Sequence, residues 1–139
     1  MTSSQLHIDL HAITDNYRLL DRQTGANTRT AAAVKADGYG LGMTAISKAL
    51  YQAGCRMFFT AQLAEAVTLR TALTRQGYDG ANIAVLEGFH QPDLPDYSAH
   101  QLTPVINHSQ QAEMLASYQR QTQAALPAIL HIDTGMTRL

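Results

Sequence analysis

Short apolar segments recur along this chain, and a stretch with helical periodicity follows each of them except the last. Five segments are apolar almost throughout, spanning residues 31–34, 57–61, 82–86, 102–106 and 128–132. Strands that are apolar on both faces are typical of parallel sheets, because helices cover both faces of the strand. The pattern therefore predicts an α/β fold with about five parallel strands and intervening helices.

Helical periodicity between these segments predicts which side chains face the core. The segment that contains Pro92 and Pro95 is expected to form a loop or a short helix. The residues expected to face inward are Ile13, Tyr17 and Leu20 in the first helix and Ala112, Leu115 and Ala116 in the last, which spans roughly residues 109–121.

Five parallel strands are compatible with an open doubly wound sheet or with part of a closed barrel, and periodicity does not separate the two. The sequence stops at Leu139, a few residues past the last expected strand, without a helix to cover that strand. A complete open sheet would usually end with such a helix, whereas a (β/α)8 barrel needs about 250 residues. We therefore expect residues 1–139 to be the incomplete N-terminal part of a (β/α)8 TIM barrel.

Composition and charge exclude several classes of partner. The 10 basic and 11 acidic residues give a formal net charge of −1, without the basic patch that nucleic acid or an anionic membrane requires. The sequence has no run of about 18 apolar residues and no signal segment. Its one cysteine, Cys55, excludes an internal disulfide and is typical of a reducing compartment. We expect a cytoplasmic protein with a small-molecule partner, no nucleic acid and no membrane.

Lys35 places an amine where an apolar strand meets a glycine-rich turn. A buried ammonium group is unfavourable unless it is paired, neutralised or covalently used, so Lys35 is a candidate for chemistry. The glycines that alternate from Gly38 to Gly42 permit positive φ around Tyr39, whose hydroxyl stays available as a donor. The first backbone N–H groups of a helix beginning near Met43 are expected to bind a phosphate. A Walker loop is excluded, since its lysine follows the glycines.

A second group of polar residues, Asp133 to Arg138, follows the last expected strand. Ligands bind at the carboxyl ends of the strands in both parallel architectures. The guanidinium of Arg138 can hold a carboxylate or phenolate oxygen through a planar fork of donors. Asp-Thr-Gly also suggests the half-site of a dimeric aspartic protease, but those proteases are rich in β-structure, whereas this chain is expected to alternate strands and helices.

The histidines are expected to bind no metal, because no zinc motif is present. His131 is of interest for another reason, since it lies close to Arg138 in sequence and is expected to face the same site. The six are His7, His11, His90, His100, His108 and His131.

The segments 33–42 and 132–139 resemble the two main motifs of the N-terminal barrel domain of alanine racemase, a fold-type III pyridoxal-phosphate enzyme. Residues 8–13 with Asn16 resemble the opening segment of that family. Phe58 to Ala61, with Glu65 and Ala66, resemble its second strand and helix. The resemblance runs in order over essentially the whole chain, with residues 78–123 matching in pattern more than in motif.

The resemblance implies a (β/α)8 barrel followed by a mostly β domain; the remainder of the barrel and the C-terminal β domain are expected to be absent from this sequence. It implies that pyridoxal 5'-phosphate is held as a Schiff base on Lys35, that Tyr39 binds its phosphate, and that Arg138 contacts its phenolic oxygen and the substrate carboxylate. The expected activity is interconversion of L-alanine and D-alanine, with Lys35 as the base on one face. The opposite base in the family is a tyrosine of the partner subunit in a homodimer, and no residue here matches it.

Three residues depart from the family pattern. His131 stands where the family often has a lysine whose carbamate orients the arginine; an imidazole can still accept a hydrogen bond from Arg138. Thr137 replaces a common glycine, which raises the question of backbone geometry if that position needs positive φ. Leu41 replaces a common histidine.

Two alternative functions remain open at this point. One is a non-catalytic protein of pyridoxal phosphate binding or homeostasis, which would keep the lysine without an opposite base. The other is a racemase of another small amino acid, such as serine. Whether the substrate is alanine or serine, about five of eight barrel strands leave both sheet edges open and the site incomplete. The 139-residue chain alone is therefore expected to be inactive and prone to associate.

Overall fold

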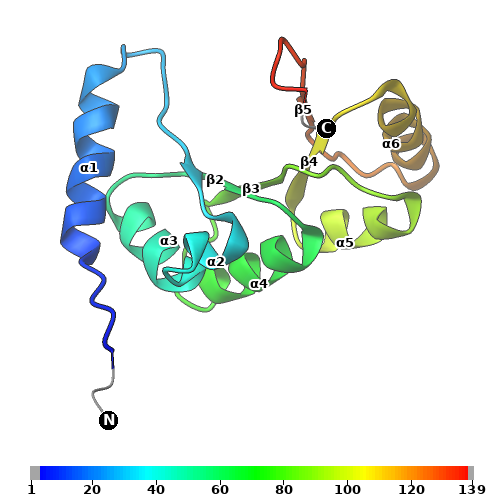
Figure 1. Cartoon of the computed structure of the whole chain (residues 1–139). Coiled ribbons are helices and arrows are strands. Elements are labelled where there is room, and N and C mark those ends of the chain that lie inside the picture. The colour runs from blue at the N-terminus through cyan, green and yellow to red at the C-terminus, as the bar shows by residue number, and fades with distance from the viewer. Residues whose placement is uncertain (1–3, 138–139) are drawn as a thin grey trace.

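A computed structural model describes residues 4–137 of the chain and contains the expected alternation of strands and helices (Figure 1). All five expected strands are present, although the outer two are shorter than expected. The elements are α1 (Leu10–Gln23), β1 (Ala32–Ala33), α2 (Lys35–Tyr39), α3 (Met43–Gln52), β2 (Met57–Thr60), α4 (Leu63–Thr74), β3 (Asn82–Val85), the 3-10 turn η1 (Gln91–Asp93), α5 (Leu94–Ala99), β4 (Leu102–Ile106), α6 (Ser109–Thr122) and β5 (Ile129–Leu130).

The strands form one parallel sheet in the order β1-β2-β3-β4-β5. Because parallel crossovers are right-handed, a strictly sequential order places successive helices on the same face. Figure 1 shows α3, α4 and α5 below the sheet. A doubly wound sheet would reverse its order at a switch point. Strand order therefore favours the barrel over the open sheet.

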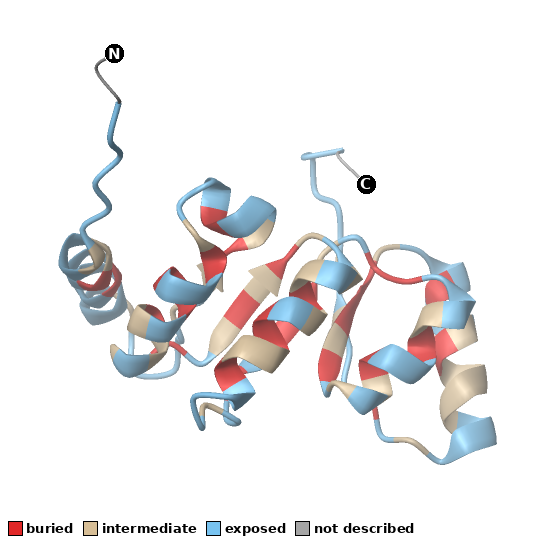
Figure 2. Cartoon of the chain, turned by 90° about the horizontal axis from the view of Figure 1, so that it is seen from below, coloured by how far each residue is buried: buried red, intermediate tan, exposed pale blue. Residues whose placement is uncertain are grey.

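The core lies between the sheet and these helices, as the buried positions in Figure 2 show. In β2, Phe58 and Thr60 are fully buried on the helix side, whereas Met57 and Phe59 are half-buried on the opposite face. This alternation follows from the two-residue period of a strand. The largest fully buried side chains of the core are Tyr97, Phe58, Leu69, Leu73, Ile83, Leu94 and Leu102.

Three expectations about burial are wrong. Leu20 of α1 is 56% exposed, and Ala112 of α6 is exposed while its neighbour Gln111 is buried. In the first apolar segment, Ala31 and Ala33 are exposed and only Val34 is buried. Periodicity identifies the face of an element, but the neighbouring elements decide how much of that face is covered.

Candidate active site at the carboxyl ends of the strands

Polar residues from four segments follow the carboxyl ends of strands in this sheet. Lys35 comes after β1, Glu65 lies in the first turn of α4 after β2, Asn107 follows β4 and His131 follows β5. Strands of a parallel sheet end at the same edge, so these residues share the side on which barrel enzymes bind ligands. Of the residues predicted from sequence, Lys35, Tyr39 and His131 are at this edge, whereas Arg138 lies outside the described residues.

The chain makes a left-handed helical turn directly after Lys35. Every residue from Ala36 to Gly40 has positive φ, between 51° and 79°. Three of them, Ala36, Asp37 and Tyr39, are not glycine, and each non-glycine residue in this conformation costs roughly 1–2 kcal/mol. The sequence suggested positive φ at the glycines, but the left-handed conformation of their neighbours was not foreseen. Strain of this kind occurs at functional sites where the surrounding structure compensates for it.

Gly38 is required at the centre of this turn. It is buried, and a Cβ atom there would lie 3.2 Å from the backbone N and Cα of Met43 and from Cδ1 of Ile46. The turn therefore packs tightly against the first residues of α3.

The amide of Met43 at the start of α3 is already bonded within the chain. The backbone N–H of Met43 donates to Oδ1 of Asp37 at 2.8 Å, so a carboxylate from the left-handed turn takes the position expected for a phosphate. Negative charge there is favoured by the helix dipole. The expectation that this amide binds a phosphate is wrong.

Glu65 connects the left-handed turn to the end of β2. Its Oε1 accepts the backbone N–H of Ala36 at 2.7 Å, and its Oε2 accepts those of Ala61 at 2.8 Å and Gln62 at 3.3 Å. Hydrogen bonds to a carboxylate are stronger than those between neutral groups. Glu65 thereby holds the peptide that immediately follows Lys35, although nothing in its sequence spacing indicated this role.

Lys35 is half-buried rather than fully buried, which corrects the expectation of a buried amine. Within residues 4–137 its ammonium group has no hydrogen bond or ion pair, and the hydroxyl of Tyr39 likewise has no partner. Tyr39 is 62% exposed. A half-exposed amine is accessible to a ligand, so this geometry is compatible with a covalent role for Lys35.

Asn107 joins the ends of three strands and was missed in the sequence. Its Nδ2 donates to the carbonyl of Leu86 after β3 at 2.9 Å, and its Oδ1 lies 3.0 Å from Nδ1 of His131 after β5. An asparagine between a strand and a helix is too common to be selected from sequence alone.

Asp133 organises the loop that follows β5. Its Oδ1 accepts the backbone N–H of Thr137 at 3.0 Å and of Gly135 at 2.9 Å. These bonds hold the pKa of the Asp133 carboxyl below its usual value, so the loop contacts persist at neutral pH and weaken only as the pH falls through that lowered pKa. The parallel sheet with intervening helices excludes the aspartic protease alternative, because those proteases are rich in β-structure.

Thr137 has φ of +48°, so this position does need the left-handed conformation that glycine adopts without strain. We expect Thr137→Gly to raise the free energy of unfolding by up to about 1 kcal/mol, because relief of left-handed strain exceeds the added backbone entropy. Urea denaturation measures the change. Thr134, which has no positive φ, is the control, and Thr134→Gly is expected to destabilise. Equal effects of the two variants would contradict this account.

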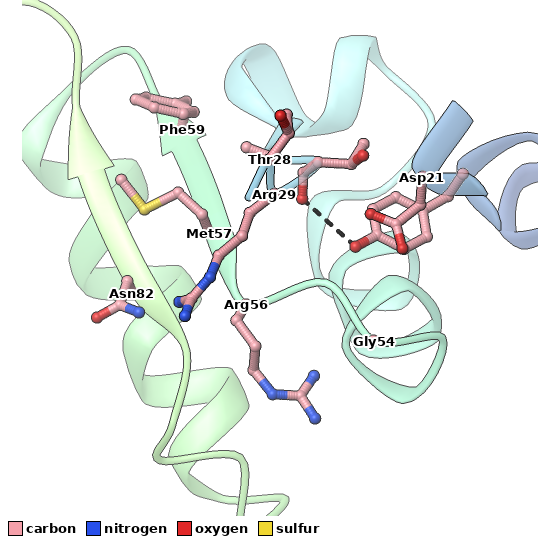
Figure 3. A pocket seen from close by; sticks show the side chains of 11 residues that line it. Asp21, Thr28, Arg29, Gly54, Arg56, Met57, Phe59 and Asn82 are labelled. Carbon is pink, nitrogen blue, oxygen red and sulfur yellow. Dashed lines mark hydrogen bonds between the residues drawn. The ribbon is translucent and has the colours of Figure 1, made fainter. Parts of the chain in front are cut away.

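A hollow of about 750 Å³ lies at the opposite end of the sheet, where the strands begin (Figure 3). Arg29, Met57 and Asn82 line it, and the dashed bond in Figure 3 is that from the Tyr17 hydroxyl to the Thr30 carbonyl at 3.3 Å. This end of a barrel contributes mainly to stability, so the hollow is not the candidate active site.

Among residues 4–137, no cluster of His, Cys, Asp and Glu could hold a metal ion, and no helix is long and apolar enough to cross a membrane.

Comparison with known proteins identifies the family. The sequence profile described as "Alanine racemase, N-terminal domain" matches residues 8–139. The catabolic alanine racemase of Agrobacterium fabrum is 42% identical over 137 residues, which cover 99% of this chain and 34% of that protein. Alanine racemase 3 of Salmonella typhi is 40% identical over 96% of this chain and 35% of its own length.

Structural comparison agrees with this result. The crystal structure of alanine racemase from Bartonella henselae, with covalently bound pyridoxal phosphate, superposes with a TM-score of 0.87 at 39% identity. The match covers 95% of this chain and 37% of that protein, so the chain spans about a third of the length of its relatives. The five parallel strands thus correspond to the N-terminal part of a TIM barrel, and the chain belongs to the alanine racemase family, in which it matches the N-terminal domain.

Proposed function

We propose that this chain is the cofactor-binding part of an alanine racemase that interconverts L-alanine and D-alanine, with Lys35 as the attachment point of pyridoxal 5'-phosphate. The observation that carries the proposal is the half-buried Lys35 at the carboxyl edge of the sheet, followed by a strained left-handed turn. The named relatives and the covalently bound cofactor of the Bartonella henselae enzyme support it.

The residues present fit this cofactor. Lys35 offers an amine without a partner among the described residues, and Tyr39 offers an exposed hydroxyl as a donor to phosphate. Arg138 is proposed to contact the phenolic oxygen and the substrate carboxylate. When bound, the cofactor supplies an electron sink for the electron pair left at the substrate Cα.

The protein's own residues would position and move the proton. The amine of Lys35, once released, is proposed to remove or return the Cα proton on one face of the substrate. The Glu65 carboxylate keeps the peptide after Lys35 in place through the Ala36 amide. The base for the opposite face is proposed to come from a partner subunit, so the full-length protein would be a homodimer, which we place in the cytoplasm.

Reductive trapping tests the proposal directly, because the sequence contains only two lysines, Lys35 and Lys48. Lys48 is exposed on α3 and serves as an internal control. The chain, and a longer version of the protein, are mixed with pyridoxal phosphate, reduced with borohydride and mapped by mass spectrometry. We expect the label on Lys35. Labelling of both lysines to the same extent, or of neither in a folded full-length chain, would refute the cofactor site.

The 139-residue chain alone is proposed to lack turnover and to associate. Apolar side chains in and after β5 support association, because Leu130, Ile132 and Met136 are 69%, 71% and 76% exposed. Racemisation of alanine by the purified chain would contradict the first statement, and a monomeric elution profile in size-exclusion chromatography the second. Racemisation of serine in preference to alanine by the full-length protein, or cofactor binding without any turnover, would favour the alternatives.

A further inference from the structure

The side-chain amide of Asn107 has a single possible orientation. Nδ2 lies 2.9 Å from the carbonyl oxygen of Leu86, and a carbonyl oxygen only accepts hydrogen bonds. The donor end of the amide therefore faces Leu86, and the acceptor end, Oδ1, faces His131.

This orientation determines the proton position on His131. Oδ1 of Asn107 cannot donate, and it lies 3.0 Å from Nδ1 of the imidazole. Nδ1 must then carry the proton, and in the neutral ring the lone pair is on Nε2. The backbone of His131 is also held, since its N–H donates to the carbonyl of Ile106 at 2.9 Å.

Asn107 is itself held by Gln111, a buried residue of α6. Oε1 of Gln111 accepts the backbone N–H of Asn107 at 2.9 Å, while its Nε2 donates to the carbonyl of Phe89 at 3.2 Å. Gly88 leaves no room for a Cβ atom beside the Gln111 amide, and the Tyr97 hydroxyl donates to the Gly88 carbonyl at 2.6 Å. The loop after β3 and the start of α6 therefore form a rigid frame around Asn107.

We propose that Asn107 is a positioning residue that selects the Nδ1–H tautomer of His131, so that Nε2 keeps its lone pair as a hydrogen-bond acceptor at the candidate site. The tautomer follows from the contacts of Asn107, whereas its use by the enzyme rests on the proposed function. A neutral amide, unlike a carboxylate, fixes the proton without favouring the imidazolium, which has no lone pair on Nε2.

Nitrogen NMR of the longest available chain, labelled with 15N-histidine, tests the tautomer without any cofactor. Spectra are recorded at about pH 8.5, where histidine is usually neutral, and the His131 signals are assigned by their loss in His131→Gln. We expect a protonated Nδ1 and an unprotonated Nε2. In Asn107→Leu, which is similar in size, both tautomers should be populated, whereas Asn107→Asp retains an acceptor and should keep the Nδ1 proton. Asn82→Leu, at the exposed start of β3, is the control and should change nothing.

An unprotonated Nδ1 in the unaltered chain, or an unchanged tautomer in Asn107→Leu with a native-like spectrum, would overturn the inference.

Kinetics of the full-length enzyme separate this inference from the proposed function. We expect Asn107→Leu to lower kcat/KM for alanine about tenfold while borohydride still labels Lys35, because one hydrogen bond accepted by Nε2 of His131 is weakened. Failure of Lys35 labelling would refute the cofactor site and leave the tautomer result standing. The expected tautomers with unchanged kcat/KM would overturn the positioning role of Asn107 in the enzyme.

Discussion

Replacement of Arg70 by methionine is expected to lower the free energy of unfolding by about 3 kcal/mol. Arg70 is 8% exposed, and its guanidinium donates to three backbone carbonyls at the amino ends of β3 and β4. Nε donates to His100 at 2.9 Å, and Nη2 donates to Ala81 at 2.8 Å and Gln101 at 3.0 Å. Methionine fills a similar volume but removes the donor from all three carbonyls. The carbonyl of Ala81 is buried, and a buried unsatisfied acceptor costs roughly 1–3 kcal/mol, to which the loss of the two part-buried hydrogen bonds adds.

Arg75, at the C-terminal end of the same helix, offers a matched control. It is exposed, and its side chain makes no hydrogen bond within residues 4–137. Arg75→Met is expected to change the free energy of unfolding by less than about 0.5 kcal/mol in urea denaturation. Arg70→Lys, with a compact ammonium in place of the planar fork, should fall between the two. Equal stabilities of Arg70→Met and Arg75→Met would show that the three carbonyls find other partners.

Replacement of Glu65 by glutamine is expected to weaken pyridoxal phosphate binding by the full-length protein 10- to 100-fold. Both carboxylate oxygens of Glu65 accept backbone N–H groups, from Ala36 on one side and from Ala61 and Gln62 on the other. Glutamine has one oxygen, so its NH2 group would face an N–H. The loss of a charged hydrogen bond, about 1.5–3 kcal/mol, corresponds to roughly this range and leaves the strained turn after Lys35 without its anchor.

Equilibrium titration with the cofactor measures this effect, and the rate of borohydride labelling at Lys35 gives an independent value. Glu113→Gln, on the exposed side of α6, is the control for the loss of one negative charge. We expect the control to bind the cofactor as the unaltered protein does. If Glu65→Gln lowered the free energy of unfolding but left cofactor affinity and labelling rate unchanged, Glu65 would contribute to stability alone.

Local sequence patterns were sufficient to predict most of the strands and helices. The segments expected at 57–61 and 102–106 are found as β2 and β4, and the last helix was expected at roughly 109–121 and spans Ser109–Thr122. These predictions succeed because apolar runs and helical periodicity reflect burial within one element. The shortened outer strands and the exposed Leu20 show where this reasoning ends, since the coverage of a face depends on elements distant in sequence.

The candidate site, like the fold, could be predicted only in part from the sequence. The sequence by itself determined the alternation of parallel strands and helices and the residue types placed after the strands, among them Lys35, Tyr39 and His131. Only the tertiary structure decided the sequential strand order, the left-handed conformation of Ala36 and Asp37, and the pairs Glu65–Ala36 and Asn107–His131, whose members lie 29 and 24 residues apart. A strained turn and a fixed tautomer both depend on hydrogen bonds between distant segments, and such bonds exist only once the sheet has brought those segments together.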